Sequence, residues 1–188
     1  MKTTKKIITI SFSLFAMLWF GCKKDSDLVR VPQPVENEPE VVTTLKILFA
    51  DSADAANVRS ATFRDPDGDG GTGPDVFDTI RLQPNKTWYA RIVLLDETKV
   101  PADSISKQIE REKNDHLFCF TPTGSAPSVV ITDRDGNNLP FGLRSTWRSS
   151  IAGTGFMKVS LRHQPGIKNG NCTGGDTDIE VNFAVKVE

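Results

Sequence analysis

An all-β fold is the class that the sequence predicts, as an antiparallel immunoglobulin-like β-sandwich of about eight strands with one short helix. The first observation is alternation near the C-terminus, where Ile179, Val181, Phe183, Val185 and Val187 alternate with mostly polar residues. This period of two is typical of a strand with one buried face. The second is that similar short runs are separated by clusters of Gly, Pro, Asn and Asp, as in sandwiches.

The elements follow in order from these patterns. The predicted strands are 45–50, 59–64, 77–82, 88–95, 116–121, 128–133, 156–163 and 179–187. One helix is predicted over 102–114, because Ile105 and Ile109 stand four residues apart and Asp103 or Ser104 can cap its start. We expect this helix to cross one end of the sandwich.

The N-terminus predicts export. Three lysines precede a 14-residue uncharged, largely apolar run (7–20), which is followed by Gly21 and Cys22. This order is typical of a signal peptide, here residues 1–21, that is cut before a lipid-acceptor cysteine. Trp19 stands where such signals usually have Leu, so a plain secretory signal with an incidental cysteine is the alternative.

Residues 22–42 are polar and proline-rich, and we expect them to tether a single domain, residues 43–188, to a membrane through lipidated Cys22. The predicted location is the outer membrane, on its periplasmic or cell-surface face. Without the leader, 20 basic and 24 acidic side chains remain, a formal charge of −4. Nucleic acid is excluded as a partner, because phosphate binding relies on clustered Lys and Arg.

Several segments resemble a group of Bacteroidota lipoproteins, with a likeness that extends over roughly residues 44–187. The segments that carry it are 63–71 (FRDPDGDGG), 82–96 (LQPNKTWYARIVLLD), 115–118 (DHLF), 160–163 (SLRH) and 174–183 (GGDTDIEVNF). Members are often encoded beside TonB-dependent outer-membrane receptors. Some carry the label of a type 1 periplasmic-binding fold, which needs alternating strands and helices over a longer chain. The resemblance implies an accessory role in uptake, with such a receptor as partner.

The two histidines form the first candidate site. His116 and His163 each end a core-facing stripe of a predicted strand. If the two strand ends are neighbours, both imidazoles and a carboxylate, Glu112 or Asp115, could bind Zn²⁺ or Cu²⁺. The alternative is a pair of half-buried histidines that are hydrogen-bonded at the rim, because the spacing matches no short metal-binding motif.

An aspartate-rich loop forms the second candidate site. Asp65, Asp67 and Asp69 recur at every second position before Gly70, as in the first half of a calcium loop. The twelfth position of such a loop is Val76 here rather than Glu, although neighbouring Asp75 could substitute. A solvated turn without metal is the alternative.

Cys119 and Cys172 are the two cysteines of the predicted domain. After export they enter an oxidising compartment, where an even pair indicates a disulfide. A free thiol on Cys119 stays open as the alternative.

Residues 139–150 form a weaker candidate, a ligand- or partner-binding segment without a regular helical or strand periodicity of apolar residues. Phe141, Arg144, Trp147 and Arg148 are residue types that anchor ligands or partners. The alternative is a strand pair whose Trp packs in the core.

No catalytic motif of the common hydrolase, phosphate-loop or dinucleotide-binding kinds occurs in the sequence, so we predict a protein that is not an enzyme. Asp176 and Asp178 are interpreted as loop and strand-start residues. The predicted function is a ligand- or metal-binding accessory to outer-membrane uptake. The alternative is a structural or adhesive surface module whose aspartate loop holds Ca²⁺ and which carries no small-molecule cargo.

Overall fold

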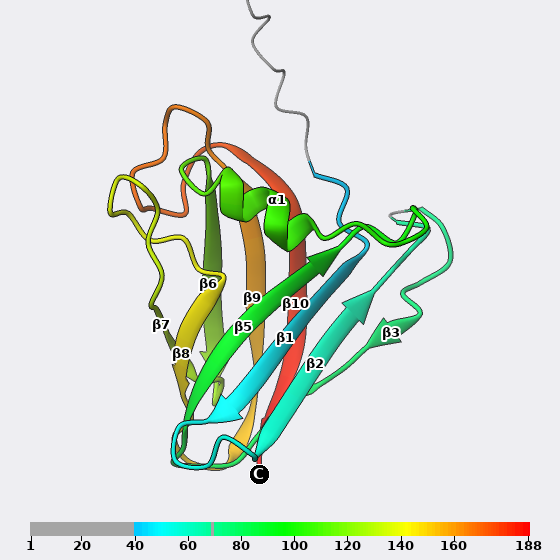
Figure 1. The fold of residues 1–188 in the computed structure, drawn as a ribbon. Helices are drawn as coiled ribbons and strands as arrows, with labels where there is room; N and C mark the ends of the chain where they lie inside the picture. The colour runs from blue at the N-terminus through cyan, green and yellow to red at the C-terminus, as the bar shows by residue number, and fades with distance from the viewer. Residues whose placement is uncertain (1–39, 69) are drawn as a thin grey trace, which may run out of the picture. The chain divides into compact units, whose positions relative to one another are not determined.

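The computed structural model describes residues 40–68 and 70–188 and has two β-sheets that face each other, with one short helix at one end (Figure 1). In spatial order, the six-stranded sheet contains β3 (Val76–Phe77), β2 (Val58–Arg64), β1 (Thr44–Asp51), β5 (Thr87–Leu95), β8 (Arg144–Arg148) and β7 (Ser128–Ile131). The four-stranded sheet contains β4 (Ile80–Leu82), β10 (Asp176–Val187), β9 (Gly153–His163) and β6 (His116–Gly124). The predicted all-β sandwich is confirmed.

Three details of the prediction are wrong. The described residues form ten strands rather than about eight, because the predicted strand 77–82 divides into β3 and β4 and because 144–148 forms β8. The second sheet is mixed, since β4 runs parallel to β10 while the other pairs are antiparallel. The helix α1 covers only Ile105–Arg111, and Ser104 takes the N-cap position without a side-chain hydrogen bond to the helix.

The core lies between the sheets and is built from the alternating inward positions of both. Aromatic contacts join the two layers: the Trp147 ring of β8 meets Phe120 of β6 edge to face at 5.7 Å, and Phe77 of β3 meets Phe183 of β10 at 5.8 Å. Edge-to-face pairs of this kind add to the stabilisation that burial gives. The two sheets are therefore held as one unit from 44 to 187.

Helix α1 covers one end of this core. Ile105 and Ile109 are buried on it, as their spacing predicts, and the Ser106 hydroxyl accepts a hydrogen bond from the Leu94 N–H of β5 at 2.6 Å. This fixes the first turn of the helix against the end of β5. No helix within the described residues is long and apolar enough to cross a bilayer.

Candidate metal centre

Strand pairing brings the two histidines together. In the antiparallel pair of β6 and β9, His116 stands directly opposite His163, and the two rings stack with centroids 4.7 Å apart. Both residues are almost fully buried, at 1% and 3% exposure. The condition on which the predicted histidine site depended, neighbouring strand ends, is thus met.

A β-bulge adds a carboxylate to this pair. The register of β10 on β9 shifts between Thr177 and Ile179, which leaves Asp178 as the extra residue of the ladder. A bulge of this kind re-aims a side chain. The side chain of Asp178 is 0% exposed, and its Oδ2 lies 3.5 Å from Nε2 of His116. Asp178 does stand at the start of β10, as interpreted from the sequence, but its buried side chain lies against His116.

The turn before β10 is fixed by close backbone contacts. Gly175 has a φ of +68°, and a Cβ at this position would clash with the His163 carbonyl oxygen. Arg162 donates hydrogen bonds to the carbonyls of Gly174 and Gly175 and to the Thr177 hydroxyl. Glycine is therefore required where the chain turns into the bulge, and Arg162 holds that turn against β9.

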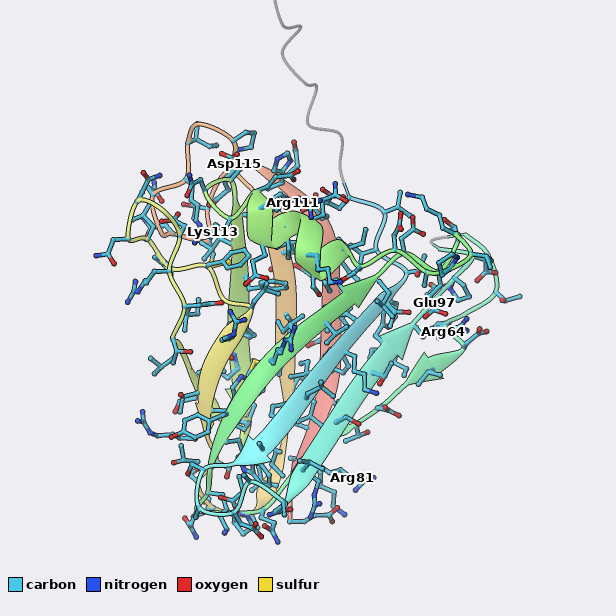
Figure 2. The ribbon with its side chains drawn as sticks, in the orientation of Figure 1. Arg64, Arg81, Glu97, Arg111, Lys113 and Asp115 are labelled. Atoms are coloured by element: carbon cyan, nitrogen blue, oxygen red, sulfur yellow. A yellow bond between two sulfur atoms is a disulfide. The ribbon has the colours of Figure 1, made fainter. Side chains whose placement is uncertain are left out.

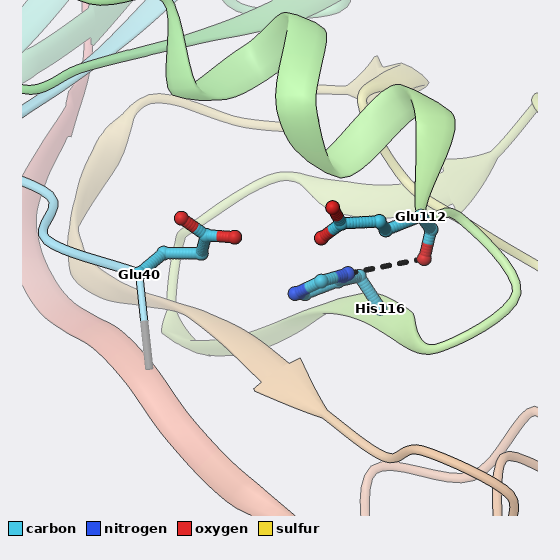
Figure 3. Close-up of side chains that lie close together, drawn as sticks. All are labelled: Glu40, Glu112 and His116. Atoms are coloured by element: carbon cyan, nitrogen blue, oxygen red, sulfur yellow. Dashed lines mark hydrogen bonds between the residues drawn. The ribbon is translucent and has the colours of Figure 1, made fainter. Parts of the chain in front are cut away.

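Glu112, at the C-cap of α1, sets the proton position on His116. The Nδ1 atom of His116 lies 3.1 Å from the Glu112 carbonyl oxygen, to which it donates as Nδ1–H (Figure 3). In the neutral ring this leaves Nε2 as a lone-pair acceptor. A backbone carbonyl that orients an imidazole through its other nitrogen is the usual outer partner of a metal-binding histidine.

Glu40 completes a cluster with Glu112 and His116. One possible ligand atom from each of the three residues lies within 4.8 Å of the others, and Figure 3 shows the two carboxylates directed toward one another beside the imidazole. The Gln108 side chain of α1 donates to Glu40 Oε1 at 2.7 Å. Glu40 belongs to the predicted tether, and no pattern in that stretch indicates that it lies at this site.

Burial and crowding of negative charge shift the titration of this cluster. Burial, together with the Glu112 and Asp178 carboxylates, raises the pKa of Glu40 to about 7. Burial also raises the pKa of Asp178, which the nearby His116 opposes, and lowers the pKa of His116. The raised pKa values favour the protonated carboxyl groups of Glu40 and Asp178, which must lose their protons to bind a cation, whereas the lowered pKa of His116 favours the neutral imidazole that binds metal.

The site leaves a buried polar atom without a hydrogen-bond donor. Among the described residues, none donates a hydrogen bond to His116 Nε2, and the polar groups near the Asp178 carboxylate are the Glu40 backbone N–H and His116. Such atoms are rare inside proteins and call for a specific explanation, of which an ion is one. With bonds of about 2.0–2.2 Å, two ligands of a tetrahedral zinc lie roughly 3.4 Å apart, which is close to the His116–Asp178 distance of 3.5 Å. The residues present therefore fit a divalent metal.

Asp115 does not join this cluster. It lies in the turn after α1, at the same end of the domain as Lys113 (Figure 2). Its backbone carbonyl accepts a hydrogen bond from the Gln164 N–H, and its carboxylate is not among the atoms that converge. Of the four residues predicted for the histidine site, His116 and Glu112 lie in the cluster, His163 stacks on the ring of His116, and Asp115 lies apart.

The aspartate loop is organised by protein groups. Asp67 Oδ2 accepts hydrogen bonds from the N–H and hydroxyl of Thr72, and Asp75 forms an ion pair with Arg64. Arg64 also contacts Glu97 at 2.8 Å, and Figure 2 shows the two side by side. Asp65 lies in the same turn, and Asp69 lies outside the described residues. The oxygens of Asp67 and Asp75 are thus directed to different partners.

The two cysteines of the domain are joined by a disulfide. Cys119, buried on β6, is bonded to Cys172 in the loop before β10. The same loop is held by the buried amide of Gln164, which donates to the carbonyls of Asn171, Thr173 and Gly174. These links fix the loop that leads into the bulge at the candidate metal centre.

The aromatic and basic set divides between core and surface. Trp147 and Phe141 are buried at 0% and 2% exposure, and the Trp147 indole N–H donates to the Ser145 hydroxyl at 2.9 Å. Arg144 and Arg148 point outward from β8, where Arg144 meets Glu110 of α1 at 3.4 Å. The prediction of Trp147 as a ligand-contacting residue is wrong, because no face of it reaches solvent.

Two parts of the prediction lie outside the described residues: Cys22 with its signal peptide, and the tether before Glu40. Comparisons of the chain with protein-family models, with curated proteins and with solved structures returned no match.

Proposed function

We propose that this chain is a metal-binding lipoprotein domain that holds Zn²⁺, or Cu²⁺ in its place, with Glu40, Glu112 and His116, and with Asp178 as a further carboxylate. One observation carries this proposal. The Nε2 lone pair of His116 faces the Asp178 carboxylate at 3.5 Å in a buried position. Two acceptors at this distance need a proton or a cation between them.

The donor set favours a transition metal over calcium. It combines an imidazole nitrogen with carboxylate oxygens, the ligands that zinc takes besides thiolate, whereas calcium takes oxygen ligands. Copper(II) binds more tightly than zinc to a given set of nitrogen and oxygen ligands, so both ions belong in a first titration. The pKa of Glu40 is raised by burial and then by the Glu112 and Asp178 carboxylates, and a divalent cation also relieves this repulsion.

The role that fits this centre is capture or hand-over of metal as an accessory to outer-membrane uptake. Support comes from the predicted lipid attachment at Cys22 and from the resemblance to lipoproteins encoded beside TonB-dependent receptors. Glu40 and Glu112 are only partly buried, so one side of the centre is accessible for exchange. A binding role, without turnover of a substrate, agrees with the absence of catalytic motifs from the sequence.

The experiment that tests the proposal is metal analysis followed by calorimetric titration of the apo chain with Zn²⁺, Cu²⁺ and Ca²⁺. We expect one zinc per chain, and at least a tenfold loss of affinity in Glu112→Gln. The matched control is Glu110→Gln, which removes an exposed carboxylate two residues earlier that pairs with Arg144. No zinc or copper binding by the wild-type chain, or equal loss in both variants, would overturn it.

The alternative function, a structural or adhesive module, has its own signature in the same titration. Calcium that binds the wild-type chain, and that persists in a double variant of His116→Ala and His163→Ala, would indicate the aspartate loop. Transition metal that is lost in the double variant supports the metal-binding accessory. The arrangement of Asp67 and Asp75, each directed to a protein partner, gives the calcium module less support.

A further inference from the structure

The outer face of the six-stranded sheet carries a groove of about 730 Å³, which is lined by residues other than those of the metal centre. Figure 1 looks onto this face, and no helix or loop crosses in front of the middle of β1, β2 and β5. Its lining includes Leu48, Ala50, Val58 and Tyr89, of which three are large apolar side chains exposed by 39–61%. Exposed apolar side chains that gather in one hollow indicate a binding surface.

The strand register arranges this lining in two rows. In one row, Ala50 of β1 pairs with Val58 of β2 and with Tyr89 of β5. Paired side chains on one face lie about 5 Å apart. The small Ala50 between two larger neighbours therefore leaves a hollow with apolar walls, roughly 10 Å across from β2 to β5 at the usual strand spacing.

The second row supplies positive charge. Leu48 of β1 pairs with Arg91 of β5, and Arg91 pairs with Arg144 of β8. The two guanidinium groups thus start from neighbouring positions on one face, and both arginines line the groove. Arg144 forms one long ion pair, in which its guanidinium lies 3.4 Å from the Glu110 carboxylate and both side chains are about half-exposed. Surface pairs of this kind are weak.

Charge complementarity identifies the kind of occupant. Within the described part of the chain, no acidic side chain lines the groove, and Arg91 has neither a hydrogen bond nor an ion pair there. This cationic row stands on a chain that is acidic once the leader is left out. Adjacent guanidinium groups match the geometry of a carboxylate, which they bind through paired N–H donors.

We propose that this groove binds an amphipathic carboxylate, such as a fatty acid of about ten carbons. The hydrocarbon lies along Val58, Ala50 and Tyr89, and the carboxylate meets Arg91 and Arg144 one row away. Two residues along a strand span about 6.8 Å, so a chain of this length reaches both rows. The volume of the groove falls within the range of small-molecule sites.

Equilibrium dialysis of labelled decanoate against the purified full chain tests the proposal. We expect saturable binding of one decanoate, weakened at least tenfold by the double change Arg91→Ala and Arg144→Ala. Arg148→Ala is the matched control, since it removes an exposed arginine of the same strand that lies outside the groove. Tyr89→Ser should weaken binding several-fold by removing part of the apolar wall. All of these side chains are exposed, so thermal unfolding should stay unchanged.

Three results would overturn it: no saturable decanoate binding up to millimolar concentration, equal binding of decyltrimethylammonium, or equal weakening by Arg148→Ala. Decyltrimethylammonium has the same hydrocarbon with the opposite charge, so it separates the contribution of the arginines from simple apolar adsorption. A lipid surface is the competing occupant. Sedimentation with phosphatidylglycerol vesicles, without binding of free decanoate, would assign the face to a membrane and reject the small-molecule site.

Discussion

His116 and Asp178 face each other through Nε2 and Oδ2 at 3.5 Å, on side chains that are 1% and 0% exposed. Because the Glu112 carbonyl holds the ring proton on Nδ1, both facing atoms are acceptors when the imidazole is neutral and the carboxylate is ionised. A proton shared between them or a bound cation removes this conflict. The centre therefore has two states, protonated apo and metal-bound.

Asp178→Asn should separate metal binding from folding. The new amide can donate an N–H to His116 Nε2, so we expect the free energy of unfolding of the apo chain to be unchanged or to rise by about 1 kcal/mol. Zinc affinity should fall at least tenfold, as measured by calorimetric titration. Asp176→Asn, an exposed change two residues earlier on β10, is the control and should leave both quantities unchanged. Unaltered zinc affinity in Asp178→Asn would show that this carboxylate takes no part.

Glu40→Gln should change how stability depends on pH. The pKa of Glu40 is about 7 in the folded chain against 4.5 for the free group, so the folded state binds this proton more tightly. The stabilisation is complete below pH 4.5 and is lost as the pH rises through about 7. When the pH rises from 5 to 8 with chelator present, the free energy of unfolding should fall by about 1–2 kcal/mol more in the wild-type chain than in Glu40→Gln. This figure allows for the partial exposure of Glu40. Urea unfolding at both pH values measures this, and parallel curves would contradict it.

Much of the fold could be predicted because alternation reports which face of a strand is buried. His116 and His163 end inward-facing stripes in the sequence, and the structure buries both on neighbouring strands. The pattern fails at Asp178, because a bulge breaks the period of two at that residue and turns a formally outward carboxylate inward. A bulge of one residue cannot be recognised from the local composition, so the alternation alone assigns Asp178 to the solvent-exposed face of the strand.

The other omissions have similarly local causes. Glu40 stands in a polar, proline-rich stretch that predicts a tether, and only its contact with Gln108 in three dimensions brings it to the centre. In β8, Ser145 and Trp147 face inward between exposed arginines, but five residues are too few to make that alternation distinct from a loop. Tertiary contacts, rather than local propensity, decide both cases.

Zinc binding should release protons. At pH 6 the Glu40 carboxyl, with a pKa of about 7, is mostly protonated, and burial raises the pKa of Asp178 as well. A metal ion needs deprotonated ligands, so at least about one proton should leave per zinc at pH 6, with fewer at pH 8.5. Calorimetry in buffers of different ionisation enthalpy gives this number. In Glu40→Gln the release at pH 6 should fall by about one proton, and an unchanged release would exclude Glu40 as its source.

The disulfide should contribute strongly to stability. Cys119 and Cys172 are 53 residues apart, and closing a loop of this length stabilises by about 4 kcal/mol in the chain-entropy description. We expect Cys119→Ala plus Cys172→Ala to lower the free energy of unfolding by roughly 2–5 kcal/mol, measured in urea. In the Cys22→Ala chain, thiol counting without reductant should find no free thiol, and two reactive thiols would contradict the bond.

A buried ion pair beside the centre should prove far more sensitive to truncation than an exposed one. Lys168 Nζ lies 2.8 Å from Asp135 Oδ2, with both side chains at most 2% exposed, and it also donates to the Lys113 carbonyl. Lys168→Ala leaves the Asp135 carboxylate without its cation, and a loss of about 3–5 kcal/mol is expected.

The matched change is Lys158→Ala, which removes an exposed partner of Glu180 at the same distance of 2.8 Å. Such surface pairs contribute at most about 1 kcal/mol. Burial raises the pKa of Asp135, but Lys168 holds it below its usual value. In Lys168→Ala the unpaired carboxylate can take up a proton at low pH, so the loss in the free energy of unfolding should be smaller there than at pH 7. Urea unfolding at pH 7 and pH 4 measures both effects, and equal losses for the two lysines would show that the buried pair has no special role.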